Sequence, residues 1–120
     1  MTPNKEMVEK LAEALKLAHD VYTLEDIIEL IEKGTLQGHV EGDTWVVTQV
    51  HTFPRKRIVE ILYVVGDLND SIRMEKKIEQ WARELNADLI IATGREGWWD
   101  FRTPGWKKTG VTYAKDLKNG

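Results

Sequence analysis

Apolar residues recur at intervals of three and four along the first part of the chain, which is the spacing of an amphipathic helix. In the first predicted helix these positions are Val8, Leu11, Leu15 and Ala18. Thr23, followed three residues later by Asp26, has the chemistry of a helix N-cap. It predicts a second helix that ends at Gly34 and has its apolar positions at Ile27, Ile28 and Ile31.

The pattern then changes to the alternation that is typical of strands. The stretch LQGHVEGDTWVVTQVHTF, residues 36–53, predicts two strands around a turn at Gly42 and Asp43. In the second of them, one face is expected to hold Val46, Thr48 and Val50, and the other Trp45, Val47, Gln49 and His51. RIVEILYVVGDL, residues 57–68, has apolar residues on both faces and Glu60 as the lone charge inside the strand, which predicts a central strand covered from both sides.

A third helix is expected after this strand, with Asp70 or Ser71 as its cap and Asn86 as its stop. Its apolar stripe is Met74, Ile78, Trp81, Ala82 and Leu85. DLIIATG, residues 88–94, predicts a short strand. Because it follows a strand, a loop and a helix, we expect a right-handed parallel crossover from residues 58–65 to residues 89–93. VTYAKDL, residues 111–117, predicts a last strand.

Composition narrows the class of protein. The 120 residues fit one domain, and 42% hydrophobic with 31% charged residues is typical of a globular chain. The absence of cysteine excludes disulfides and thiolate metal sites. The net charge of −3, with basic residues spread along the chain, indicates no nucleic-acid surface. The charged N-terminus and the lack of a long apolar run lead us to expect a cytoplasmic protein without a leader or a membrane span.

The order of elements, an α/β (α+β) arrangement in one domain over residues 1–120, is similar to the acyltransferase fold of the GNAT superfamily. Three motifs, GD-L at residues 66–68, WA-x-x-L at 81–85 and GR-x-GW at 94–98, resemble a group of small GNAT-like proteins of tailed, particularly short-tailed, bacteriophages. The resemblance covers residues 20–117. It implies a protein encoded among virion-assembly genes, present in the infected bacterium or the virion, whose molecular role is poorly defined.

Acetyltransferases of this superfamily hold the pyrophosphate of acetyl-CoA on a turn of the pattern Arg/Gln-x-x-Gly-x-Gly/Ala, where a helix N-terminus faces the anion. The corresponding stretch is GDLNDSIRME, residues 66–75, which has no glycine after Gly66. Carboxylates stand where phosphates would lie, and they repel them. The chain is therefore expected to bind no acetyl-CoA. The degenerate turn comprises Asp67, Asn69, Asp70, Ser71 and Arg73.

Acid–base and metal candidates are few. By the superfamily pattern, Glu60 is a candidate general base and Tyr113 a candidate general acid. The alternative is that Glu60 pairs with a basic side chain and that Tyr113 is a core ring with a wet hydroxyl. His39 and His51 are expected to be neighbours across the hairpin, but two histidines without a carboxylate cluster predict no metal site.

The segment GREGWWDFRTPGW, residues 94–106, concentrates aromatic and arginine residues, which are enriched in binding hot spots. It predicts either a hydrophobic plug, with Trp106 packed over the acetyl-CoA cleft, or a partner surface; its candidate residues are Arg95, Trp98, Trp99, Arg102 and Trp106. The main hypothesis is a non-catalytic protein that binds other virion or assembly proteins. The alternatives are an acetyl-CoA-dependent N-acetyltransferase and a phage protein that binds a host defence factor.

Overall fold

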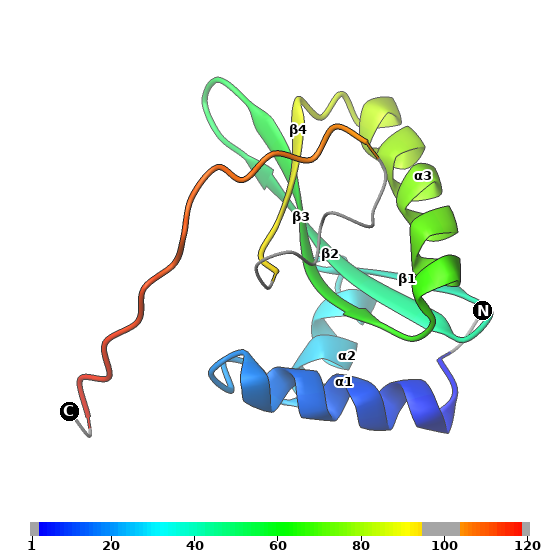
Figure 1. Cartoon of the computed structure of the whole chain (residues 1–120), viewed down its shortest axis with the longest axis vertical. Coiled ribbons are helices and arrows are strands. Elements are labelled where there is room, and N and C mark those ends of the chain that lie inside the picture. Colours follow the sequence, from blue (N-terminus) through cyan, green and yellow to red (C-terminus); the bar gives the residue numbers. More distant parts are fainter. Residues whose placement is uncertain (1–2, 95–103, 119–120) are drawn as a thin grey trace.

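A computed structural model describes residues 3–94 and 104–118 of the chain. A four-stranded sheet lies between two N-terminal helices on one face and a third helix on the other (Figure 1). The elements in chain order are α1 (Lys5–Leu17), α2 (Leu24–Glu32), β1 (Gln37–Glu41), β2 (Thr44–Thr52), β3 (Arg57–Val65), α3 (Leu68–Glu84) and β4 (Leu89–Ala92).

The two N-terminal helices form where the apolar spacing and the caps predict them. Asn4 caps α1 by accepting a hydrogen bond from the backbone of Met7, and Thr23 caps α2 through a complete capping box. The helices turn their apolar stripes to the sheet, although Ile28, expected on that stripe, is 42% exposed. The α2 stripe is narrower than predicted, since one residue beside Ile27 already turns out of the interface.

The sheet has the order β1-β2-β3-β4. The first three strands are antiparallel, and β3 pairs with β4 in parallel, which confirms the predicted hairpin and crossover. Between β2 and β3 the register shifts at Val47/Thr48, because Val47 pairs with Tyr63 and Thr48 with Ile61. This bulge leaves Leu62 without a partner on β2.

Two hydrophobic clusters fill the two sides of the sheet. The cluster under α1 and α2 consists of Met7, Leu11, Leu15, Ile27, Leu36, Trp45, Val47, Tyr63 and Val65. The cluster under α3, called the α3-face cluster below, consists of Val46, Ile61, Met74 and Ile78. Strand β3 therefore contributes to both sides, as its apolar sequence predicts.

Helix α3 begins at Leu68, three or four residues before the start that a cap at Asp70 or Ser71 implies. Asp67, rather than Asp70 or Ser71, is the cap, because its carboxylate accepts a hydrogen bond from the backbone N–H of Asp70 at 3.0 Å. At the other end Asn86 has φ +59 and terminates the helix as predicted.

The predicted last strand is wrong. Residues 107–116 have no regular secondary structure, and the segment runs away from the body of the molecule (Figure 1, orange to red). Alternation of apolar and polar residues favours an extended chain, but a strand also needs a hydrogen-bonding partner edge. Among the described residues, no helix has the length and apolar character that crossing a membrane requires.

Candidate functional site

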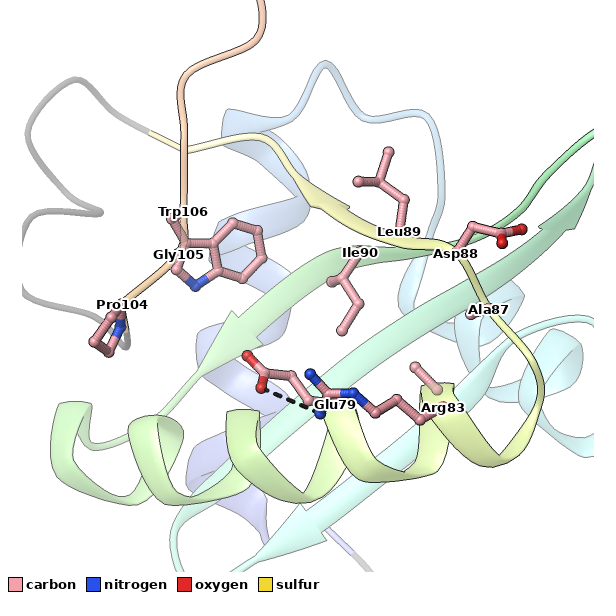
Figure 2. Close-up of a pocket in the computed structure, with 10 residues that line it drawn as sticks. Glu79, Arg83, Ala87, Asp88, Leu89, Ile90, Pro104, Gly105 and Trp106 are labelled. Atoms are coloured by element: carbon pink, nitrogen blue, oxygen red, sulfur yellow. Dashed lines mark ion pairs between the residues drawn. The ribbon is translucent and has the colours of Figure 1, made fainter.

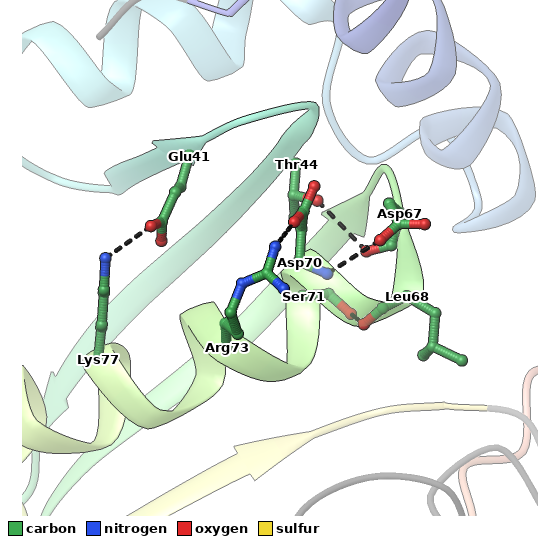
Figure 3. Close-up of polar contacts among 8 residues, drawn as sticks. All are labelled: Glu41, Thr44, Asp67, Leu68, Asp70, Ser71, Arg73 and Lys77. Carbon is green, nitrogen blue, oxygen red and sulfur yellow. Dashed lines mark hydrogen bonds and ion pairs between the residues drawn. The ribbon is translucent and has the colours of Figure 1, made fainter.

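The N-terminus of α3 is the place where this topology offers backbone N–H groups to an anion. Gly66 leads into it with φ +126, and a Cβ at this position would lie 2.2 Å from the backbone oxygen of Asp43. Buried Thr44 donates from Oγ1 to the backbone oxygen of Asp67 at 3.3 Å. The β3–α3 turn is thus held tightly against the β1–β2 turn (Figure 3).

Carboxylates already occupy this helix N-terminus. The Asp67 carboxylate accepts from the backbone of Asp70, and Arg73 pairs with the Asp70 carboxylate (Figure 3). Ser71 is buried and donates to the backbone oxygen of Leu68 at 2.7 Å, while Asn69 is exposed. The turn thus presents two carboxylates where a phosphate group would need N–H donors. These residues do not fit the pyrophosphate of a coenzyme A ester.

A pocket of about 290 Å³ lies between α3, β4 and residues 104–106 (Figure 2). The indole of Trp106 packs against the α3-face cluster and donates from Nε1 to Oε2 of Glu75 at 3.0 Å. Glu75 is only 2% exposed, so this hydrogen bond anchors the segment after residue 103 to the buried face of α3. The pocket wall also carries charged side chains, Glu79, Arg83 and Asp88.

Trp106 therefore packs back over the sheet, as the plug interpretation predicts. The other members of the aromatic and arginine segment lie outside the described residues: Arg95, Trp98, Trp99 and Arg102. Their role as a partner surface stays a prediction.

A second group of polar residues lies on the opposite face of the sheet. His51 of β2 and Glu60 of β3 approach to 2.9 Å, between Nε2 and Oε1, and both are partly buried. The His51 ring stacks on Phe53 with centroids 5.9 Å apart. Nearby, burial raises the pKa of Tyr63 above its ordinary value, and the Tyr22 and Glu60 charges raise it further.

His51 is the partner of Glu60, where the sequence predicts a basic Arg or Lys side chain. The register between β2 and β3 brings the two residues together. His51 pairs with Ile58, so it lies diagonal to Glu60 on the same face of the sheet. A carboxylate that is hydrogen-bonded to an imidazole, as Glu60 is to His51, could accept a proton from a bound amine.

The other candidates do not join this pair. Tyr113 is 89% exposed on the C-terminal segment, so it is neither a core ring nor a neighbour of Glu60 in this structure. His39 is no neighbour of His51 across the hairpin, because it pairs with Val46. It contacts Thr48 instead, and burial lowers the pKa of its ring. Among the described residues no group of three or more His, Asp or Glu could hold a metal ion.

Comparison with known proteins identifies the fold. No family model and no curated sequence matches the chain. An aminoglycoside acetyltransferase from an uncultured soil metagenomic sample, solved with sisomicin, superposes with a TM-score of 0.68 at 10% identity, covering 94% of this chain and 87% of its own. A probable acetyltransferase superposes with a TM-score of 0.55 at 11% identity, covering 94% and 96%. The chain has the fold of GNAT acetyltransferases, as the sequence predicts.

Proposed function

We propose that the chain is a GNAT-fold protein that has no acyl-CoA chemistry and acts by binding another protein. One observation carries this proposal: the carboxylate of Asp67 caps α3 at the point where a coenzyme A ester would need a free helix N-terminus. The structural neighbours share the fold, and a shared fold hosts many unrelated functions.

The electrostatics of the turn support the proposal. Two unit charges of the same sign 4 Å apart repel by about 1 kcal/mol in water and by about 4 kcal/mol near a protein surface. Asp67 and Asp70 would both face the two negative charges of a pyrophosphate. Arg73 already pairs with Asp70, so it offers that phosphate little net attraction.

The resemblance to phage proteins supports the choice of partner. A protein of virion assembly would meet other virion proteins in the infected cell and could remain in the particle. Trp106 is hydrogen-bonded to Glu75 within the chain. The partner surface would therefore be formed by the residues before Trp106, above all Trp98 and Trp99. Arg95 and Arg102 would add bidentate contacts to carboxylates of that partner.

The test compares Trp98→Ala and Trp99→Ala, each measured for unfolding in urea and for binding to purified virion proteins. The adjacent side chains diverge on any regular backbone, so one change should destabilise the fold by a few kcal/mol and the other by about 0.5 kcal/mol or less. The second change should weaken binding at least about thirtyfold. Equal and large destabilisation by both would sink the partner surface. Binding to a host defence protein instead of a virion protein would favour the host-factor alternative.

A second candidate is an acetyl-CoA-dependent N-acetyltransferase. The His51–Glu60 pair favours it, because these side chains on β2 and β3 could accept the proton of an attacking amine. Sisomicin, the ligand of the metagenomic enzyme, supplies an amine for the assay. Turnover that Glu60→Gln lowers at least about a hundredfold would establish this candidate. No release of coenzyme A above the uncatalysed rate would eliminate it for this amine.

A further inference from the structure

Strand β4 forms a short edge of the described sheet. It lies at the edge of the described sheet, pairs only with β3, and covers Leu89–Ala92 against the nine residues of β3. Its sequence is entirely apolar, yet none of its four residues is fully buried, and Leu89 is 49% exposed. Figure 2 shows the Leu89 side chain pointing away from α3, whereas Ile90 points toward it. An apolar edge strand of this kind is a template for another strand.

The C-terminal segment, residues 107–117, is the complementary element. Its large apolar side chains stand at every second position or a multiple of it, and they are exposed: Val111 at 59%, Tyr113 at 89% and Leu117 at 86%. In an extended chain these three side chains lie on one face. The segment thus has the pattern of a half-buried strand, and it lacks a sheet to join.

We infer that residues 110–117 of one copy add as a strand to the β4 edge of a second copy, and that the exchange is reciprocal. Among the described residues, each chain has an apolar edge at β4 and an extended C-terminal segment with strand-like alternation, so a two-fold dimer would pair the two reciprocally. In Figure 1 the segment crosses β4 in the view, and its C-terminal part then runs away from the sheet. Trp106, held by Glu75, fixes the point from which it departs.

Charge favours the same arrangement. Residues 107–118 contain four lysines and one aspartate, a net of +3. Since the whole chain has a net charge of −3, the remainder carries −6. The lysine-rich segment of one copy is therefore attracted to the acidic body of the other, which raises the association rate and makes it sensitive to salt. This inference is independent of the proposed function, because it needs neither the candidate partner-binding residues before Trp106 nor the α3 N-terminus.

The first test measures the mass of the full chain by light scattering across a concentration series from micromolar to millimolar. We expect a dimer whose dissociation constant rises at least about tenfold in Tyr113→Lys, because a buried ring is lost from the interface. Thr112→Lys is the matched control: Thr112 lies on the other face of the extended segment, so its dimer should persist. Thr112→Pro and Tyr113→Pro probe the backbone, since one of them must remove a ladder hydrogen bond whichever way the strand faces. A monomer at every concentration would overturn the inference, as would an unchanged dimer in Tyr113→Lys and both proline variants.

The second test asks which copy receives the strand. The chain has no cysteine, so Leu89→Cys and Tyr113→Cys each introduce a single thiol. Mixing the two single variants with a short bis-maleimide should give a cross-linked pair of chains that denaturation does not separate. The double variant provides the comparison: cross-linking within one chain, with no product in the mixture, would show that the segment folds back on its own β4 and would refute the exchange.

Discussion

Trp106 donates a hydrogen bond from its indole Nε1 to Oε2 of Glu75 across 3.0 Å, and Glu75 is 2% exposed. A buried carboxylate on a helix that otherwise packs apolar residues requires such donors, because a buried charge without hydrogen bonds is costly. The contact fixes Trp106 against α3, where its ring forms part of the wall of the pocket between α3 and β4.

Trp106→Phe should therefore lower the free energy of unfolding by about 1–3 kcal/mol. The smaller ring still packs on the α3-face cluster, but the Glu75 carboxylate loses this donor. Urea denaturation measures the change, and Glu75→Gln combined with Trp106→Phe in a double-mutant cycle isolates the pairwise energy. A coupling energy below about 0.3 kcal/mol would show that the hydrogen bond contributes nothing to stability.

Gly66→Ala should destabilise the fold by more than about 2 kcal/mol, because the added Cβ meets the backbone of Asp43 and Thr44 and the backbone has φ +126. Gly110→Ala is the control, since a Cβ there meets nothing within 4 Å. Its effect should stay within about 0.5 kcal/mol. Thermal unfolding of both variants checks the pair, and a tolerated Gly66→Ala would mean that the two turns are not packed as described.

Trp81→Ala should cost roughly 1.5–3 kcal/mol. Trp81 is only half-buried, but it packs on the α3-face cluster and meets the His39 ring edge-on, with centroids 4.9 Å apart. Exposed Lys76 on the same helix supplies the comparison, and Lys76→Ala should change stability by about 0.5 kcal/mol or less. Equal effects of the two changes on urea unfolding would contradict this packing.

Stability should fall in mild acid through His39. Burial against Thr48 and Trp81 lowers the pKa of this ring below its ordinary 6.5, so the unfolded chain takes up a proton before the folded one does. The contribution is complete above pH 6.5 and is lost as the pH falls below that value. His39→Gln should flatten this part of the pH dependence of the unfolding free energy. Identical pH profiles for the variant and the parent chain would refute the assignment.

The helices and the strand order followed from local signals in the sequence. Three predictions depend only on neighbouring residues, and the structure confirms them: the Thr23–Asp26 cap, the turn at Gly42, and the strand β3 with apolar residues on both faces. The cap of α3 was misplaced because Asp67, Asp70 and Ser71 all have capping chemistry. The structure decides among them, because Asp67 is extended, with φ −76 and ψ 137, and its carboxylate accepts from the backbone N–H of Asp70.

Features that depend on long-range contacts were harder to predict. The His51–Glu60 pair depends on the register between β2 and β3, and a bulge lies in the same strand pair. The Trp106–Glu75 bond joins residues 31 positions apart, and nothing local marks Glu75 as buried. The segment 111–117 has the right pattern for a strand, but pattern alone does not say whether the partner edge belongs to the same chain.

We propose that the α3 N-terminus, capped by the Asp67 carboxylate, binds no coenzyme A ester. Calorimetric titration with acetyl-CoA measures this binding directly. Asp67→Ser is the informative variant, because serine keeps the N-cap of α3 and removes the negative charge. We predict no saturable heat for the parent chain up to millimolar acetyl-CoA. One-to-one binding to the parent chain with micromolar affinity would contradict the claim and would favour the acetyltransferase.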